Sequence, residues 1–404
     1  MALTLESIYE ARRRIGGFIY YSPCPYSETL SRLTNARVFS KFENLQMTGS
    51  FKERGALNRL LTLDPDEKKR GVIAASAGNH AQGVAYHAQR LGIRAIIVMP
   101  EYTPLIKVAN TRQYGAEVVV YGANYDAACG HALSLQQQTG CVFVHAFNDY
   151  DVMAGQGTIG LEILEQVPDL DAVVVPVGGG GLIAGVAVAV KEQKPSVRVI
   201  GVQSQCVPSM KTSLEVEELV CLRPEGRTIA DGIAVRMPGD LTFPIIQKYV
   251  DEIVTADDDE IANAILLLLE VEKTVVEGAG AIALAALLNR SLHLEGKNVV
   301  HLLSGGNIDV NMLSVIIRRG LARDGRLVRL RVLLRDQPGA LLGLSNVLAG
   351  ARANILEITH HRTFTQAALG EAEVDLDLET EGAEHVERIM KVLAESGYEA
   401  QRIE

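Results

Sequence analysis

The sequence predicts an α/β fold built on parallel sheets, followed by a smaller C-terminal module of a different style. Between about residue 70 and residue 303, short β-rich runs alternate with helical stretches, which is the pattern of parallel strands joined by helices. The runs 95–98 and 172–175 are apolar at every position, as expected for strands covered on both faces. After residue 326 this alternation ends.

The expected strands of the α/β part are short β-rich runs, each followed by a helical stretch. Ligands of parallel sheets bind beyond the carboxyl ends of the strands, so we expect the functional residues in the loops that follow these runs. The expected strands lie at 71–75, 94–99, 117–121, 142–145, 172–177, 198–202 and 298–303.

The C-terminal module has the order β-α-β-β-α-β, which is that of a ferredoxin-like fold. Residues 320–326 are expected to be the linker, with domains at 1–322 and 326–404. The expected elements of the module are strand 327–334, helix 341–348, strand 354–362, the alternating strand 371–378, a helix over about 384–395 and a short closing strand.

Composition favours small-molecule chemistry. The chain has 404 residues and a formal net charge of −10, without a dense run of Lys or Arg, which argues against a nucleic-acid partner. No apolar run reaches the length needed to span a membrane, and the N-terminus does not resemble a signal peptide. Five scattered cysteines indicate neither a disulfide framework nor a zinc site. We expect a cytoplasmic protein without a membrane partner.

Lys52 is the first candidate for chemistry, because it opens a predicted helix directly behind a small polar turn, in the motif 48–56. A lone lysine is usually a solvated surface charge. Here it is accompanied by three further motifs that follow predicted strands. These motifs are Ser76-Ala77-Gly78-Asn79-His80, the four consecutive glycines Gly178 to Gly181, and Ser304-Gly305-Gly306-Asn307.

The glycine run predicts a phosphate site. It follows an apolar strand and precedes a helix, which leaves bare backbone N–H groups beside a helix N-terminus. The alternative is a tight turn in which glycine only relieves steric strain. A dinucleotide fingerprint can also be read as Gly179-x-Gly181-x-x-Ala184, but the next strand ends at Val202-Gln203 without the acid expected to hold a ribose. NAD is therefore disfavoured.

A phosphate site beside an amine suggests pyridoxal 5'-phosphate, held as a Schiff base on Lys52. With the motif at Ser76–His80 and that at Ser304–Asn307, the chain resembles the threonine dehydratase (threonine ammonia-lyase) family of fold type II pyridoxal-phosphate enzymes, over residues 1 to about 320. The resemblance implies a two-lobed fold like that of the tryptophan synthase β subunit. Its large lobe would comprise 1–47 and 151–322, and its small lobe 48–150.

The resemblance also implies roles for these residues. Lys52 would be the Schiff-base lysine, with Phe51 packed beside the cofactor ring. Asn79 would contact the ring hydroxyl and Ser304 the pyridine nitrogen. Taken alone, Asn79 reads equally well as a turn residue, His80 as a core histidine and Ser304 as a cap. The phosphate would be bound by Gly178, Gly179, Gly180 and Gly181, and the substrate carboxylate by the turn of Ser76, Ala77, Gly78, Asn79 and His80.

A neutral serine at the pyridine nitrogen would leave the ring uncharged, a moderated electron sink that suits β-elimination. Lys52 would then remove the α-proton of the substrate. L-Threonine would give 2-oxobutanoate and ammonia, and L-serine would give pyruvate and ammonia. A magnesium site is not expected, because residues 203–209 lack the acids that serine racemases carry there. A monovalent cation is not excluded.

Three alternatives stay open. The nearest is a serine racemase, but that family has a second serine in the turn where this chain has Ala77. The others are a catalytically silent amino-acid sensor and a β-replacement enzyme related to cysteine synthases. Glu277 is either near the cofactor or an acid at a helix N-terminus. The pair Asp231-Gly232 matches a family motif, but the sequence gives it no role.

The C-terminal module resembles an ACT regulatory domain, which pairs with a copy of itself and binds amino acids at the shared edge. We expect a homodimer or homotetramer under allosteric control, although the module could serve assembly alone. Isoleucine would be the effector of an enzyme of isoleucine biosynthesis, and valine, leucine or no effector would fit a catabolic one. The candidate effector residues are Gln337, Pro338, Gly339, Ala340, Asn354 and Ile355.

Overall fold

The structure, a computed structural model, describes residues 2–223, 226–289, 292–363 and 367–403. The chain divides into two compact units, Met1–Ile308 and Asp309–Glu404. Among the described residues, no helix is long and apolar enough to cross a membrane.

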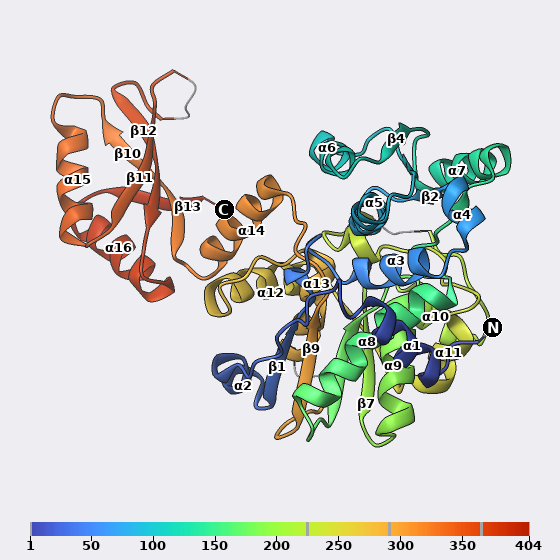
Figure 1. Cartoon of the computed structure of the whole chain (residues 1–404). Coiled ribbons are helices and arrows are strands. Elements are labelled where there is room, and N and C mark those ends of the chain that lie inside the picture. Colours follow the sequence, from blue (N-terminus) through green and yellow to red (C-terminus); the bar gives the residue numbers. More distant parts are fainter. Residues whose placement is uncertain (1, 224–225, 290–291, 364–366, 404) are drawn as a thin grey trace. The chain divides into compact units, whose positions relative to one another are not determined.

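A parallel sheet of five strands organises much of the first unit, in the order β1-β9-β6-β7-β8. Strands β1 and β9 come from distant parts of the sequence and lie side by side (Figure 1). The predicted parallel arrangement is thus confirmed. The strands are β1 (Arg37–Phe42), β6 (Ala172–Pro176), β7 (Arg198–Ser204), β8 (Glu252–Ala256) and β9 (Asn298–Leu303).

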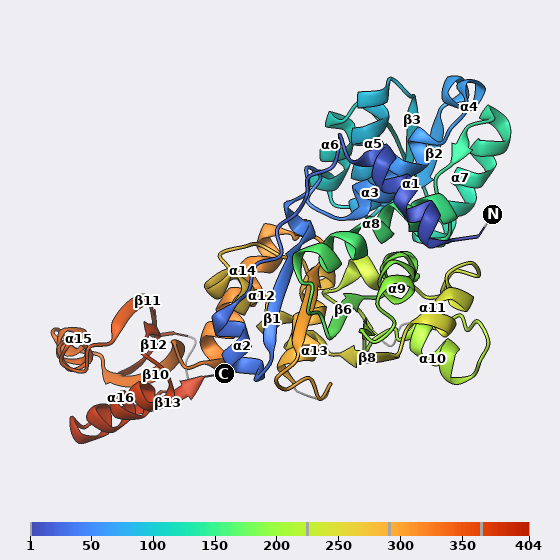
Figure 2. The same ribbon diagram turned by 60° about the horizontal axis from the view of Figure 1, so that its bottom comes forward.

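Helices cover both faces of this sheet. Figure 2 shows α8 (Tyr150–Gln166) and α9 (Gly181–Gln193) on one side and α13 (Gly278–Leu288) on the other. Helices α8 and α9 pack closely because glycines face each other. A Cβ added to Gly185 would lie 2.6 Å from the backbone nitrogen of Gly157.

A second parallel sheet has the order β4-β3-β2-β5, and its own core is packed from apolar residues of 56–152. Its strands are β2 (Val72–Ala75), β3 (Ala95–Met99), β4 (Glu117–Val120) and β5 (Val142–Phe143). The helices of this region are α3 (Lys52–Leu61), α4 (Pro65–Arg70), α5 (Asn79–Leu91), α6 (Leu105–Gln113) and α7 (Tyr125–Thr139).

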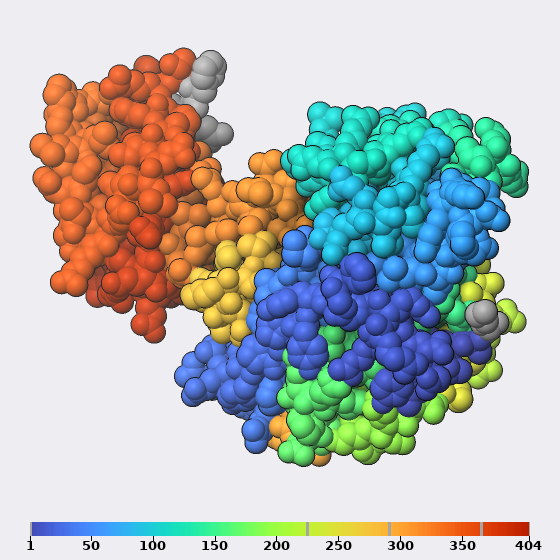
Figure 3. All heavy atoms as spheres, in the orientation of Figure 1, coloured from blue at the N-terminus to red at the C-terminus, as the bar shows by residue number. Residues whose placement is uncertain are grey.

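The N-terminal helix α1 (Leu5–Ile15) lies on the surface of the first unit, coloured dark blue in Figure 3. Thr4 and Ser7 form a reciprocal cap at its start, and its inner face buries Ile8 and Ala11. The remaining elements of the unit are α2 (Glu28–Thr34), α10 (Ser209–Glu215), α11 (Phe243–Tyr249), α12 (Asp258–Val271) and the short 3-10 helices η1 (Glu43–Leu45) and η2 (Asp231–Ile233).

The second unit contains an antiparallel sheet in the order β11-β12-β10-β13, and the predicted β-α-β-β-α-β order is confirmed. It begins with an additional helix, α14 (Val310–Arg323). The other elements are β10 (Leu327–Arg335), α15 (Ala340–Gly350), β11 (Asn354–His361), β12 (Glu371–Glu379), α16 (Ala383–Glu395) and β13 (Glu399–Ile403).

The linker predicted at 320–326 is wrong in its first half. Residues 320–323 are the last turn of α14. Along the chain, the boundary between the two units lies between Ile308 and Asp309. The helix that begins at Val310 continues through Gly320 to Arg323. The predicted domain end at 322 therefore falls inside a helix.

Candidate active site

The loop after β9 and the turn before α3 are joined by backbone hydrogen bonds, although about 250 residues separate them. Ser50 and Gly305 form an isolated antiparallel bridge. The amide of Phe51 donates to the carbonyl of Ser304 at 3.1 Å. These bonds bring Lys52 and Ser304, two of the predicted site residues, to the same place at the carboxyl end of the first sheet.

Lys52 is the first residue of α3, as predicted. Its Nζ donates to the carbonyl oxygen of Ala146 at 2.9 Å and lies 5.2 Å from the ring centroid of Phe51. Burial lowers the pKa of the Lys52 amine to about 8, and the negative charge of Glu277 offsets this only in part. Near neutral pH a fraction of Lys52 is therefore unprotonated, which is the form a nucleophilic amine needs.

The glycine loop lies at the start of α9, and Gly180 has a φ of +100°. Within the described part of the chain, the backbone N–H groups of Gly178 to Gly181 donate no hydrogen bond. Side chains would find little room there, since a Cβ on Gly179 would lie 2.3 Å from the ring of Phe147. Unpaired amides at the N-terminus of a helix fit a phosphate group.

Asn79 is fixed at both ends of its amide. Its Nδ2 donates to Glu277 Oε1 at 2.6 Å, and its Oδ1 accepts from Asn307 Nδ2 at 2.8 Å. Asn307 Nδ2 also donates to the carbonyl of Thr48 at 2.8 Å. The contacts link the second sheet, through α5, to the loops after β9 and before α3 and α13. They fix the orientation of the Asn79 amide.

Glu277 was left out of the predicted site, but it lies within it. It is buried and forms the N-cap of α13 without a side-chain capping bond. Burial, reinforced by the charge of Asp231, raises the pKa of the Glu277 carboxyl to about 7. The interpretation of Glu277 as an acid that only stabilises a helix N-terminus was thus incomplete, because its carboxyl group accepts a hydrogen bond from Asn79. Asn79 lies more than 190 residues away, so no local sequence pattern could predict this contact.

The pKa of Glu277 predicts how stability depends on pH. The folded state retains this proton to about pH 7, whereas the unfolded chain loses it near the usual 4.5. Stability should therefore fall as pH rises from about 4.5 to about 7, with a contribution of about 3 kcal/mol from this one group. Denaturant unfolding of wild type and Glu277→Gln at pH 5 and pH 8 measures it. The stability of the variant relative to wild type should be greater at pH 8 than at pH 5, and a difference independent of pH would contradict the assignment.

The turn from Ser76 to His80 has the predicted place, after β2 and at the start of α5. The hydroxyl of Ser76 accepts from the amide of Gly78 at 3.2 Å. The ring of His80, however, points into the protein, where its Nε2 lies 2.9 Å from the carbonyl oxygen of Val144. Burial lowers the pKa of His80 to about 3, so its ring remains neutral and only its backbone remains a candidate for binding a carboxylate.

Ser304 is buried, and its hydroxyl lies 3.3 Å from the carbonyl oxygen of Ala279 in α13. No charged side chain bonds to it among the described residues, which suits a neutral partner for a pyridine nitrogen. His145 is a further residue that the sequence did not suggest. Its Nδ1 accepts from the amides of Phe147 and Asn148, and burial lowers its pKa to about 4. It thereby shapes the segment that carries the Ala146 carbonyl.

Two ion pairs connect the second sheet's helices to the segment around Asp231. Lys107 of α6 lies 3.1 Å from Asp231, and Arg236 lies 2.9 Å from Asp126 of α7. Asp231, which the sequence left without a role, thus pairs with Lys107 and also lies near Glu277.

In the second unit, a cavity of about 340 Å³ is lined by residues 334–341 and by His360 and Arg362. It includes four of the predicted effector residues, those from Gln337 to Ala340. The other two are elsewhere: Asn354 bonds to Glu379, and Ile355 packs into the core of the unit. For these two, the structure offers no place in the cavity.

Known protein families match both parts of the chain. A family described as pyridoxal-phosphate dependent enzyme matches residues 15–305, and the ACT domain family matches residues 328–395.

Individual relatives cover most of the chain. The L-threonine ammonia-lyase of Thermotoga maritima strain MSB8 is 52% identical over 398 residues, 98% of each chain. The catabolic L-threonine dehydratase TdcB of Escherichia coli K12 is 46% identical over 318 residues, 78% of this chain and 96% of that protein. Among solved structures, maize serine racemase matches with a TM-score of 0.75 and 35% identity, covering 80% of this chain and 99% of that one.

Proposed function

We propose that this chain, which belongs to the pyridoxal-phosphate dependent enzyme family, eliminates water from L-threonine, after which water hydrolyses the released enamine, so that the net products are 2-oxobutanoate and ammonia. It is an enzyme of the threonine ammonia-lyase class, and its cofactor is pyridoxal 5'-phosphate. L-Serine would give pyruvate by the same route. The observation that carries the proposal is the meeting of Lys52, the free glycine amides and Ser304 at one sheet edge.

The residues present fit the cofactor. The amides of Gly178 to Gly181 would bind its phosphate, Asn79 its ring hydroxyl, and Ser304 its pyridine nitrogen. When bound, the cofactor supplies an electron sink that acidifies the α-carbon of an amino acid. Ser304 donates only a neutral hydroxyl, which moderates that sink.

Lys52 would both hold the cofactor and take the α-proton. Its amine is partly unprotonated near neutral pH because burial has lowered its pKa to about 8. The carbonyl of Ala146 fixes the direction of Nζ through a hydrogen bond of 2.9 Å. The backbone of the turn from Ser76 to Asn79 would bind the substrate carboxylate, which leaves the β-hydroxyl free to depart.

Serine racemisation is the second candidate, favoured by the likeness to maize serine racemase. Racemisation needs a proton donor on the face opposite Lys52. The residue between Ser76 and Gly78 is Ala77, whose methyl group cannot supply a proton. We therefore expect elimination to dominate. Chiral chromatography of a reaction with L-serine tests this: pyruvate should exceed D-serine by far, and D-serine as the main product would contradict the proposal.

We further propose that the cavity of the second unit binds an amino-acid effector. It lies at the N-terminus of α15, where Gly339 has a φ of +89°, and backbone N–H groups there suit a carboxylate. Arg335 and Arg362 add positive charge, while Asp336, 3.1 Å from Arg362, could pair with an ammonium group. Isoleucine fits a biosynthetic duty, and valine or leucine a catabolic one.

Asp336→Asn should weaken the response to the effector, because it removes the carboxylate that would face the ammonium group. The ratio of threonine turnover with and without each amino acid, isoleucine, valine and leucine, should move towards one. The matched control is Asn354→Ala, a predicted effector residue outside the cavity, which should keep the wild-type ratio. Loss of the response in Asn354→Ala alone would place the effector elsewhere.

The relatives leave three further predictions about this chain untested. A homodimer or homotetramer, a cytoplasmic location and a monovalent cation all stay predictions. A catalytically silent sensor is disfavoured, because Lys52, Asn79 and Ser304 are all present in the chain, and a decayed site should have lost at least one of them.

A further inference from the structure

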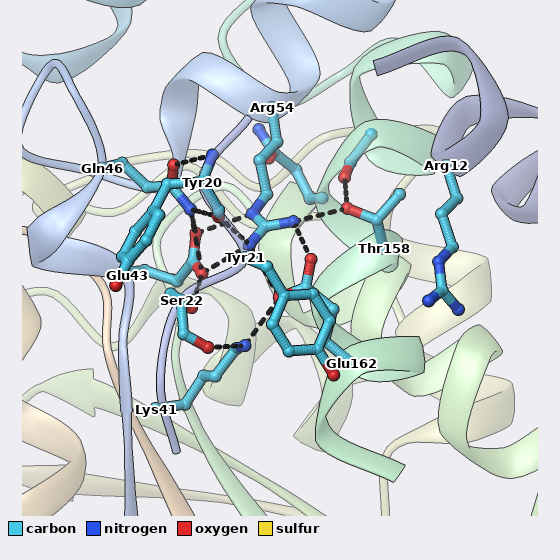
Figure 4. A network of polar contacts seen from close by, with 12 residues as sticks. Arg12, Tyr20, Tyr21, Ser22, Lys41, Glu43, Gln46, Arg54, Thr158 and Glu162 are labelled. Carbon is cyan, nitrogen blue, oxygen red and sulfur yellow. Dashed lines mark hydrogen bonds and ion pairs between the residues drawn. The ribbon is translucent and has the colours of Figure 1, made fainter. Parts of the chain in front are cut away.

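Four ionised side chains are buried together beside helix α3, outside the candidate active site (Figure 4). They are Lys41 at the end of β1, Glu43 of η1, Arg54 of α3 and Glu162 of α8, and none is more than 6% exposed. Two positive and two negative charges balance. The cluster ties three separate parts of the first unit to one another.

Arg54 is the centre of this cluster. Its Nε and Nη2 donate to the two carboxylate oxygens of Glu43, both at 2.8 Å. Its Nη1 and Nη2 donate to the two oxygens of Glu162 at 2.6 and 2.9 Å, and Nη1 also reaches Thr158 at 3.1 Å. A planar guanidinium held by two bidentate carboxylates has one orientation only.

Arg54 and Lys52 point in opposite directions from the same helical turn. Each residue of an α-helix advances by about 100°, so two residues differ by about 200° around the axis. Lys52 reaches the carbonyl of Ala146 on one side, and Arg54 reaches the cluster on the other. A rotation of this turn would move both side chains at once.

Other contacts also hold the start of α3, among them the backbone bond from Phe51 to Ser304 and a bond of 3.2 Å from the Gly55 amide to Gln156 Oε1, but each is a single hydrogen bond and none is bidentate. The N-cap residue, Phe51, makes no side-chain capping bond. Gly155 lets the helices meet, since a Cβ there would lie 2.6 Å from the carbonyl oxygen of Arg54. Close contact of this kind allows rotation, whereas hydrogen bonds to two carboxylates do not.

We propose that Arg54 is a positioning residue for the reaction: its guanidinium, held by Glu43 and Glu162, sets the rotation of the first turn of α3 and thereby the place of Lys52 Nζ. The inference rests on the role given to Lys52 under the proposed function. It also accounts for the choice of charges, because apolar side chains of similar volume can stabilise a core equally well but do not fix an orientation.

Lys41 provides a matched control within the same cluster. Its Nζ donates to Glu162 at 2.6 Å, to the carbonyl of Ser22 at 2.7 Å and to Gln166 at 2.9 Å, and among the described residues it makes no hydrogen bond to α3. Lys41→Met removes a buried charge but leaves the bidentate bonds of Arg54 to Glu43 and Glu162 in place. Arg54→Lys keeps the positive charge but removes the guanidinium that makes these bidentate bonds. Both should lower Tm.

The test measures how cofactor-free protein reacts with pyridoxal 5'-phosphate, followed by borohydride reduction and peptide mapping. In wild type we expect the label on Lys52, with a rate that rises with pH to a midpoint near 8. Lys41→Met should retain that midpoint and a rate within about twofold, whereas Arg54→Lys should react about 10 to 100 times more slowly, as expected for a displaced reacting group. The kcat for L-threonine should fall by a similar factor.

Each other outcome speaks against the inference. A wild-type rate and midpoint in Arg54→Lys, despite a lower Tm, would show that Arg54 only stabilises the fold. An equal loss in Lys41→Met would point to general destabilisation. If the label in the wild-type protein is found on a lysine other than Lys52, the result would instead overturn the role of Lys52. If Arg54→Lys does not fold, Glu43→Gln takes its place, and an unchanged labelling rate in that variant overturns the proposal.

Discussion

Lys52→Ala should abolish the turnover of L-threonine, with kcat falling by at least about 10³-fold, and should remove the visible absorption of the bound cofactor. The structure gives two reasons. The Lys52 amine has a pKa lowered by burial to about 8 and is aimed by the carbonyl of Ala146. Among the described residues, no other lysine donates a hydrogen bond to this carbonyl. Stopped-flow and steady-state assays of 2-oxobutanoate measure the loss.

The control for Lys52 is Lys69→Ala, which removes a lysine whose side chain is 80% exposed. It should keep wild-type kcat and the visible absorption. Full activity of Lys52→Ala would remove the lysine from the mechanism, whatever the fold and the relatives suggest.

Gly179→Ala should weaken the binding of pyridoxal 5'-phosphate by about 10 to 100-fold, since overpacking of this kind typically costs about 1–3 kcal/mol. The added methyl group would lie 2.3 Å from the ring of Phe147, so either the ring or the loop must move. Movement of the loop displaces the free amides that fit the phosphate. Titration of cofactor-free protein, followed by absorbance, gives the Kd.

Two further variants separate a displaced loop from a damaged fold. Gly130→Ala in α7 adds a methyl group to open space, with no atom within 4 Å, and should leave the Kd unchanged. Phe147→Ala combined with Gly179→Ala makes room for the methyl group and should recover part of the affinity. A normal Kd in Gly179→Ala would mean that the phosphate is held elsewhere.

Local patterns in the sequence predicted most of the strands, because buried parallel strands are continuously apolar and their neighbours are helical. Strand β1 was missed because two of its six residues, Ser40 and Lys41, are polar yet fully buried. Ser40 bonds to His301, and Lys41 to Glu162. Strand β8 lies at the edge of the sheet and is only partly buried, which weakens its apolar signal.

The residues of the candidate site also divide into those that a local sequence pattern reveals and those that depend on distant contacts. Lys52, the glycine loop and Ser304 were found because each follows a turn with a recognisable local chemistry. Glu277 was left off the predicted site, and Glu162 as a partner of Arg54 was not found, because both roles depend on contacts between residues more than 100 positions apart. For His80 the sequence left a core histidine open as an alternative, and the structure has the ring buried against the carbonyl of Val144, a contact that no local pattern reveals.

The central claim is tested most directly by adding L-threonine to the purified protein while its visible spectrum, ammonia and 2-oxobutanoate are followed together. We expect a yellow protein that releases ammonia and 2-oxobutanoate in equal amounts. A colourless protein that remains inert after addition of pyridoxal 5'-phosphate would contradict the account, and would leave the second unit as the part that functions.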